Sequence, residues 1–255
     1  MKIILLRHGE SQWNLENRFT GWTDVKLTNL GKIEAEYSGK QILKKNIKVD
    51  TIYSSILKRS VDTARIVANV INFPPSKIIK HWRLNERHYG KLQGLNKSET
   101  AKRYGEEQVH LWRRSFDIPP PLVDENDKHH PRNNSIFKSL RNKKLPAGES
   151  LKDVICRINP FWSHFSNKLS NEKNYLIVAH SNSLRAIVKI IENLSSKKIV
   201  DVEIPTGVPL VYDFDNDFNF TTKNFLIDNN LLKTKQELIK NQGKAEWIFL
   251  NLMYW

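Results

Sequence analysis

The sequence predicts an α/β fold, a three-layer sandwich in which helices flank a mainly parallel central sheet. Two short apolar runs, KIILL (2–6) and YLIVA (175–179), have the length and character of buried strands. Helical patterns lie between and after these two runs. Alternation of strand, loop and helix along one chain is typical of a parallel sheet whose faces are covered by helices.

Two helices are predicted from apolar residues that recur every three or four positions. The first series comprises Leu57, Val61, Ala64, Ala68 and Ile71. The second begins directly after the strand at 175–179 and comprises Leu184, Ile187, Val188, Ile191 and Leu194. Each series forms a stripe on one side of a helix, as expected for a helix that packs against a sheet.

The rest of the chain predicts a single domain with a tail. Two later runs, VPLVYDFD (208–215) and FTTKNFLI (220–227), are expected to be edge strands. The stretch 117–149 is polar and rich in proline, and predicts a long surface excursion. No segment resembles a linker that would divide the chain. We therefore expect one domain over residues 1–227 and a C-terminal tail over 228–255.

The composition is that of a globular protein with a large positive charge. The 255 residues are 39% hydrophobic, which is enough to build a core, and the formal net charge is +14. Such a charge is expected either from a nucleic-acid-binding surface or from basic residues spread over the whole protein. The densest basic run, KSLRNKK (138–144), contains no aromatic residue. We therefore favour the diffuse distribution, without a nucleic-acid partner, and a field that attracts small anions to a cleft.

The sequence also favours a soluble, cytoplasmic protein. No apolar stretch approaches the roughly 20 residues that a membrane-spanning helix needs, so no membrane partner is expected. The N-terminus lacks the pattern of a signal peptide. The single cysteine, Cys156, excludes an internal disulfide, and we expect it to be a small buried apolar residue on a helix.

Each of the two apolar strands ends in a histidine. His8 follows the first strand in LLRHG, and His180 follows the other in VAHSNS. Ligands of open α/β sheets bind outside the carboxyl ends of the strands, so the two imidazoles are candidates for one site. Metal binding is disfavoured, because HxH and HExxH patterns are absent and Arg7 would repel a cation.

Arginines near the ends of the predicted elements indicate an anion site instead. Arg7 precedes His8, Arg59 lies in LKRS, and Arg113 and Arg114 form a pair in LWRRS. Each of them alone is better interpreted as part of a solvated helix face. Guanidinium groups, however, match the oxygens of phosphate and carboxylate, and a histidine among them can act as a phosphoryl-accepting nucleophile. The combination therefore suggests a phosphate pocket.

The motifs extend well beyond RHG, and they resemble the histidine phosphatase superfamily. Within it, the chain is similar to the phosphoglycerate mutases that depend on 2,3-bisphosphoglycerate. The block LNERHYG…WRR is generally absent from the simple phosphatases of the superfamily and therefore selects the mutases. The matching segments are RHGESQWNLENRFTGWTDVKLTNLG (7–31), SSILKRSVDTA (54–64), LNERHYGKLQGLNKSETAKRYG (84–105), WRRSFDIPPP (112–121), AHSNSLRAIVK (179–189), IPTGVPLVYDFD (204–215) and NQGKA (241–245).

The resemblance implies a role for each matching residue. His8 is the nucleophile, and Glu86 is the general acid and base for the substrate hydroxyl. Arg7, Arg59 and His180 stabilise the charge of the transferring phosphoryl group. The residues that hold the other phosphate and carboxylate groups are Asn14, Thr20, Gly21, Arg87, Tyr89, Lys97, Arg113, Arg114, Ser181 and Asn182. Without the motif, Glu86 would be interpreted as the partner of Arg87 in a salt bridge.

The implied activity is the interconversion of 2-phosphoglycerate and 3-phosphoglycerate in glycolysis and gluconeogenesis. The bisphosphate serves as primer and intermediate, and no metal is required. A homo-oligomer, dimer or tetramer, is also implied. Two rival functions remain at this point. The same pocket could favour synthesis or hydrolysis of the bisphosphate, or a basic protein could keep the fold and bind polyanions without catalysis.

The sequence departs from the family pattern at two places. AHSNS has Ser181 where the family has glycine, at a position whose backbone N–H faces a substrate oxygen. We expect Ser181 to begin a helix with a negative φ, and hence with little strain. The second departure is the aromatic extension EWIFLNLMYW (246–255). In the family the tail is mobile and lies near the mouth of the active site.

Overall fold

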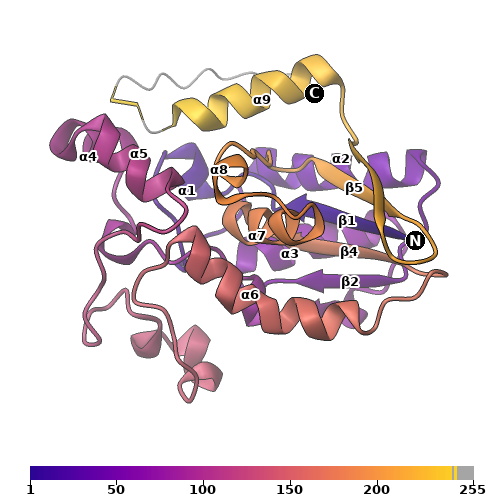
Figure 1. Cartoon of the computed structure of the whole chain (residues 1–255), viewed down its shortest axis with the longest axis horizontal. Helices are drawn as coiled ribbons and strands as arrows, with labels where there is room; N and C mark the ends of the chain where they lie inside the picture. Colours follow the sequence, from indigo (N-terminus) through magenta and orange to yellow (C-terminus); the bar gives the residue numbers. More distant parts are fainter. Residues whose placement is uncertain (243, 246–255) are drawn as a thin grey trace.

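The computed structural model describes residues 1–242 and 244–245 of the chain (Figure 1). Within these residues a six-stranded sheet has the order β3-β2-β4-β1-β5-β6. The strands are β1 (Lys2–Arg7), β2 (Thr51–Ser54), β3 (Ile79–Lys80), β4 (Asn174–Ala179), β5 (Pro209–Phe214) and β6 (Phe220–Phe225). The first four strands are parallel to one another, and β5 and β6 pair in antiparallel fashion. The predicted mainly parallel sheet is therefore confirmed.

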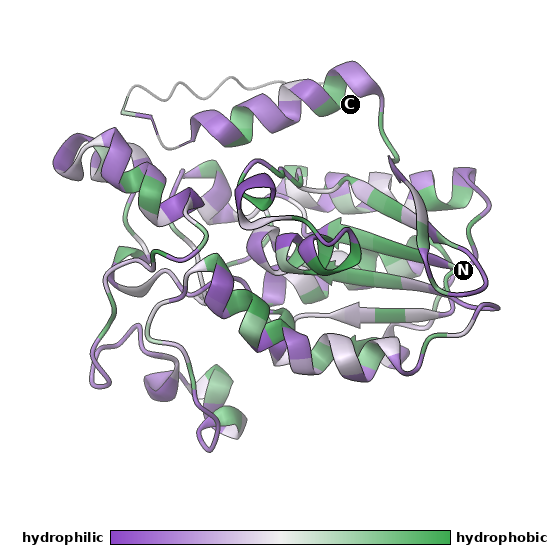
Figure 2. Cartoon of the chain, viewed as in Figure 1, coloured by the Kyte–Doolittle hydropathy of each residue, from purple (hydrophilic) through white to green (hydrophobic). Residues whose placement is uncertain are grey.

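Helices cover both faces of the sheet. The helices are α1 (Gln12–Leu15), α2 (Asn29–Lys44), α3 (Lys58–Val70), α4 (Lys97–Tyr104), α5 (Glu106–Arg114), α6 (Leu151–Ser166), α7 (Ser181–Ile191), α8 (Ser196–Ile199) and α9 (Asn229–Asn241). Both helices that the apolar periodicity predicted are present, as α3 and α7. Green apolar positions run along the central strands (Figure 2).

The alternation of side chains along β1 separates two cores. Ile3 and Leu5 pack in a core that includes residues of α6 and α7, whereas Ile4 and Leu6 pack in a core that includes residues of α2 and α3. Successive side chains of a strand point to opposite faces, so a fully apolar run is what a strand buried on both faces requires. The three-layer arrangement follows from this run.

The parallel pairing of β1 with β4 brings the two candidate histidines to the same edge. Arg7 lies opposite Ala179 in the register, and the N–H of His8 donates to the carbonyl oxygen of Ala179 at 3.0 Å. His180 is the next residue along β4 and caps the N-terminus of α7. The carboxyl ends of β1 and β4 therefore present both imidazoles at one edge of the sheet.

Two expectations about the fold are wrong. β5 is not an edge strand, because it lies between β1 and β6 and its first four residues are buried. Cys156 is exposed on α6. It lies two positions from the buried residues Val154 and Ile158, about 200° around the helix from either, and so points away from the sheet.

The segment 117–149 runs over the surface, as predicted, but it has an anchor. It contains two short 3₁₀ helices, Pro131–Asn133 and Ser135–Leu140. Phe137 is buried, and its ring lies 5.0 Å from that of Trp22. This contact forms part of a small satellite core that holds the excursion against the domain.

The tail begins as a helix that has no buried residue of its own. α9 lies above α5 and the end of α8 in Figure 1. The aromatic extension at 246–255 lies outside the described residues, and the mobility of the tail stays a prediction. Among the helices that are described, none is both long and apolar enough to span a membrane.

Candidate active site

His8 and His180 lie together at the carboxyl edge of the sheet. Both are buried, and their ring centroids are 4.9 Å apart. The Nδ1–H of His8 donates to the carbonyl oxygen of Gly9 at 2.7 Å, and Nε of Arg59 donates to Nε2 of His8 at 3.2 Å. Because Nε2 accepts this bond, it carries the lone pair that a nucleophilic imidazole needs.

The surroundings favour the neutral form of both imidazoles. Burial holds the pKa of His8 well below its usual range, and the charges of Arg59 and Arg7 lower it further. The pKa of His180 is lowered in the same way, by burial first and then by Arg59. At neutral pH, therefore, neither ring is protonated at both nitrogens.

The loop that presents His8 is closed by backbone contacts. Gly9 packs against Gly31 of α2, and a Cβ atom built on Gly9 would lie 2.0 Å from the carbonyl oxygen of Gly31. The N–H of Gly9 donates to the hydroxyl of Thr63, and the N–H of Glu10 donates to the carboxylate of Glu34. The direction of the His8 side chain is thus fixed by the elements around it.

Backbone carbonyls hold the two arginines beside His8. Arg59 lies in the first turn of α3, and its Nη1 and Nη2 donate to the carbonyl oxygens of Thr23 and Gly21 at 2.9 and 2.8 Å. Nη1 of Arg7 donates to the carbonyl oxygen of Ile204 at 3.0 Å. Burial lowers the pKa of Arg59 to about 10, which leaves it charged at neutral pH.

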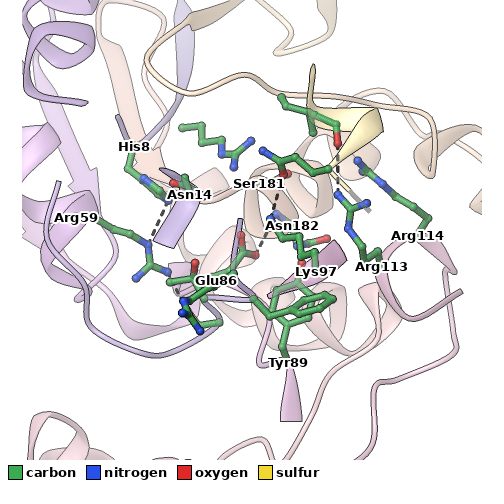
Figure 3. Close-up of a pocket in the computed structure, with 17 residues that line it drawn as sticks. His8, Asn14, Arg59, Glu86, Tyr89, Lys97, Arg113, Arg114, Ser181 and Asn182 are labelled. Carbon is green, nitrogen blue, oxygen red and sulfur yellow. Dashed lines mark hydrogen bonds between the residues drawn. The ribbon is translucent and has the colours of Figure 1, made fainter. Parts of the chain in front are cut away.

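A pocket opens in front of these groups, and most of its lining residues carry polar side chains (Figure 3). It is lined by Arg7, His8, Asn14, Arg18, Phe19, Thr20, Gly21, Arg59, Glu86, Tyr89, Lys97, Arg113, Arg114, Ser181, Asn182, Ile239 and Gln242. All of the site residues predicted from the sequence belong to this set except His180 and Arg87. Four further lining residues were not predicted from the sequence, namely Arg18, Phe19, Ile239 and Gln242.

Arg87 lies behind the pocket wall. Its guanidinium carbon lies 4.5 Å from the centroid of the Tyr89 ring, and its Nη2 donates to the carbonyl oxygen of Arg113 at 2.9 Å. The side chain is fully buried. Arg87 is thus in a position to support Tyr89 and Arg113, which line the pocket themselves.

Glu86 is a pocket carboxylate that is bound by backbone donors. Its Oε1 accepts from the N–H of Arg87 at 2.7 Å and from the N–H of Asn182 in the first turn of α7 at 3.1 Å. Among the described ion pairs, none joins the side chains of Glu86 and Arg87, so the salt-bridge interpretation gains no support. Figure 3 shows the carboxylate between His8 and Tyr89.

The opposite wall carries a concentration of positive charge. Lys97, Arg113 and Arg114 line the pocket there, and burial, followed by the charge of Arg113, holds the pKa of Lys97 well below its usual range. Nζ of Lys97 donates to Oε1 of Gln242 at 3.1 Å, and Nη2 of Arg113 donates to the carbonyl oxygen of Ile239 at 3.3 Å. The end of α9 therefore forms part of the pocket wall.

The remaining predicted ligands are placed by local structure. Asn14 belongs to a capping box at the start of α1, where its Oδ1 accepts from the N–H and the hydroxyl of Ser11. Ser181 is the first residue of α7 and does not have a positive φ, so the expected helical start is confirmed. The described residues contain no cluster of three or more histidine, cysteine, aspartate or glutamate side chains that could hold a metal ion.

Comparison with known proteins agrees with the geometry. Residues 3–143 and 121–223 match the family model of the histidine phosphatase superfamily (branch 1). A 2,3-bisphosphoglycerate-dependent phosphoglycerate mutase from Elusimicrobium minutum is 49% identical over 96% of this chain and 99% of its own length. A protein of the same name from Lachnoclostridium phytofermentans is 48% identical over the same shares.

Solved structures show the same fold at lower identity. A mycobacterial glucosyl-3-phosphoglycerate phosphatase superposes with a TM-score of 0.67 at 20% identity, covering 86% of this chain and 96% of the other. An alpha-ribazole phosphatase from Shigella flexneri has a TM-score of 0.64 at 19% identity, covering 90% and 100%. The chain therefore belongs to the histidine phosphatase superfamily and, within it, to the family of the 2,3-bisphosphoglycerate-dependent phosphoglycerate mutases.

Proposed function

We propose that this protein interconverts 2-phosphoglycerate and 3-phosphoglycerate through a phosphohistidine and a 2,3-bisphosphoglycerate intermediate, in glycolysis and gluconeogenesis. The observation that carries the proposal is Nε2 of His8, the ring nitrogen that accepts a hydrogen bond. It faces a guanidinium at 3.2 Å and shares a pocket with the carboxylate of Glu86. The similarity to the mutases over 96% of the chain supports the same reaction.

Transfer from the bisphosphate begins at His8. Nε2 attacks phosphorus, the bond between phosphorus and the glycerate oxygen breaks, and the leaving oxygen takes the proton that Glu86 gained in the other half-reaction. In the other half-reaction a hydroxyl of the monophosphate attacks the phosphohistidine, the bond from Nε2 to phosphorus breaks, and Glu86 takes the hydroxyl proton. Between the two half-reactions the bisphosphate reorients in the pocket. His8 then removes the phosphate that the substrate carried at first, and the product keeps the phosphate that came from His8.

The guanidinium groups beside His8 are proposed to neutralise the negative charge of the transferring phosphoryl group. Arg7 and Arg59 are held by backbone carbonyls before any ligand binds, so they stand close to the place where charge develops on the phosphoryl oxygens, and Nε of Arg59 has only to release Nε2 of His8. His180, packed against His8, is proposed to assist them. With cations in these positions, the proposed chemistry needs no metal.

The far end of the pocket is proposed to bind the phosphate and carboxylate groups that do not react. Arg113 and Arg114 supply charge there, and Lys97 supplies a hydrogen-bond donor. Neutral donors are proposed to complete the site, namely Asn14, Thr20, Gly21, Tyr89, Ser181 and Asn182. Arg87 is proposed to act through Tyr89 and Arg113. We further propose that residues 1–227 form the catalytic domain, whose pocket wall is completed by the end of α9. We also propose that the protein is a cytoplasmic homo-oligomer acting on small molecules.

The test is a coupled assay that converts newly formed 2-phosphoglycerate into a spectroscopic signal, run in excess chelator with and without 2,3-bisphosphoglycerate. We expect turnover in chelator and a marked stimulation by the bisphosphate. Release of inorganic phosphate is followed in the same samples. Phosphate release without isomerisation would contradict the mutase assignment in favour of a phosphatase, and activity that returns only with added manganese would contradict the proposed chemistry.

A further inference from the structure

Glu203 is a buried carboxylate in direct contact with the pocket wall. It lies in the loop between α8 and β5, and 6% of its surface is exposed. Its Oε1 accepts from Nη2 of Arg114 at 2.5 Å, and Arg114 lines the pocket. The carbonyl oxygen of Glu203 also accepts from the side chain of Gln236 in α9 at 3.3 Å.

The neighbourhood of Glu203 is rich in positive charge. Burial lowers the pKa of Arg113 to about 10 and that of Arg185 to about 9, and the charge of Glu203 acts in the opposite direction on both. The same is true of Arg7, where the negative charge of Glu203 also favours the protonated form. Glu203 therefore acts as a counter-charge for several buried guanidinium groups at once.

Half of the carboxylate remains without a protein partner. Oε2 of Glu203 is buried and has no hydrogen-bond partner within the described part of the chain. A structural ion pair would be expected to satisfy both oxygens. Glu149 does so, because Arg157 donates to both of its oxygens and the N–H of His88 donates to one of them.

Other buried acids do not contact the pocket wall through their ion pairs. Glu149 pairs with Arg157 and Glu34 pairs with Lys235, and neither of these basic residues lines the pocket. The pair of Glu203 with Arg114 differs, because it places a full negative charge one side chain behind an anion-binding surface.

We propose that Glu203 sets the charge selectivity of the pocket by opposing the binding of anions in proportion to their negative charge. This inference rests on the proposed function, in which the bisphosphate and the monophosphates occupy the same site. The Arg114 guanidinium attracts each ligand, and the carboxylate behind it repels each ligand. The repulsion grows with the charge of the ligand, so the bisphosphate is held less tightly than the cations alone would hold it.

The proposal gives Glu203 a role in turnover as well as in binding. The bisphosphate must reorient between the two half-reactions, and excessive affinity for it would slow this step. A buried charge pair is weakly screened by salt, so the effect persists at physiological ionic strength. Glutamine at this position keeps an oxygen that can accept from Arg114 and removes only the charge.

The test compares Glu203→Gln, Glu203→Asp and the parent by calorimetry with inorganic phosphate, 3-phosphoglycerate and 2,3-bisphosphoglycerate. All three proteins carry His8→Ala, so that no transfer consumes the ligand. For Glu203→Gln we expect affinity to rise about twofold for the monophosphate and about tenfold for the bisphosphate. Glu203→Asp keeps the charge, and we expect it to keep the parental ratio of the two affinities.

The control is Glu192→Gln, which neutralises a carboxylate paired with Lys223 away from the pocket and should leave the ratio unchanged. An unchanged ratio in Glu203→Gln, or an equal rise of the ratio in Glu203→Asp, would overturn the proposal. Melting temperatures establish that each variant is folded. Calorimetry measures binding, whereas the coupled assay on the unmodified protein measures isomerisation. A negative result for Glu203 can therefore be distinguished from a negative result for the proposed function.

Discussion

Nε of Arg59 points at Nε2 of His8 across 3.2 Å, so a guanidinium occupies the direction along which the imidazole lone pair projects. A phosphoryl group that bonds to Nε2 must take the place of this N–H, which can then donate to a phosphoryl oxygen. Arg59 is also anchored to the carbonyl oxygens of Gly21 and Thr23. The cation is therefore in place both for the incoming anion and for the phosphohistidine.

Replacement of the nucleophile should abolish both turnover and labelling. We expect His8→Ala to lose isomerisation and to take up no acid-labile, alkali-stable phosphate from the bisphosphate, because the nucleophilic nitrogen is removed. Labelling of the purified protein, followed by acid and alkali treatment, measures this directly. His110→Ala, a change at an exposed histidine of α5, serves as the control and should label normally. Substantial turnover by His8→Ala would remove His8 from the mechanism.

Glu86→Gln should separate binding from transfer. The amide keeps an oxygen for the N–H groups of Arg87 and Asn182 but cannot exchange the substrate proton. We expect bisphosphate affinity to stay within a few-fold, and turnover to fall by about a hundred- to ten-thousand-fold. Single-turnover transfer and equilibrium binding are measured on the same preparation. Turnover near that of the parent protein would show that the proton moves by another route.

Stability should decline as the pH falls below neutrality, and His88 should contribute to this decline. Burial lowers its pKa to about 4, and the neutral ring is fully bonded: Nε2–H donates to the carbonyl oxygen of His129, and Nδ1 accepts from the N–H of Gly90. The unfolded chain takes up this proton near its ordinary pKa of about 6.5, so the stabilisation is present above that pH. It is lost between about 6.5 and 4, and amounts to on the order of 3 kcal/mol.

Urea unfolding at a series of pH values measures the effect of His88. The free energy of unfolding should depend less steeply on pH between about 6.5 and 4 in His88→Gln than in the parent protein. His110→Gln, at an exposed position, should keep the parental slope. Parallel curves for parent and His88→Gln would show that His88 does not carry this linkage.

Ser181→Gly should alter affinity only modestly. Ser181 begins α7 without a positive φ, so the serine adds a small polar side chain to the pocket wall without backbone strain. We expect a change of a few-fold in KM, with turnover preserved or improved, from steady-state kinetics in both directions. An inactive parent protein that Ser181→Gly restores would contradict the view that serine is compatible with this site.

Much of the site could be predicted because its histidines directly follow strands that are recognisable in the sequence. His8 and His180 each follow a buried strand, and parallel strands end at the same edge, so their meeting follows from the chain direction alone. Arg59 was a candidate because it lies near the end of a predicted element, whereas the role of Glu86 came from the motif alone. Residues 84 to 97 form mostly loops, in which apolar residues do not recur at a regular spacing. The contacts of this segment could therefore not be derived from the sequence.

The missed features depend on contacts between distant segments. Ile239 and Gln242 reach the pocket because α9 crosses over it, and no local pattern reports such a crossing. β5 was placed at the edge because it comes late in the chain, whereas strand order is set by which partners bury its apolar run. Cys156 was expected inside from its residue type, but its position on α6 faces water.

The contact of Gly9 with Gly31 limits the substitutions that this sequence can accept during evolution. A single methyl group at Gly9 would overlap the carbonyl oxygen of Gly31, and one at Gly31 would overlap that of Glu10. Both clashes are with backbone atoms, which cannot turn aside as a side chain can. Substitutions of Gly9 and Gly31, beside the nucleophile, are therefore not tolerated. The first residue of α7 does tolerate a larger side chain, because Ser181 already occupies it.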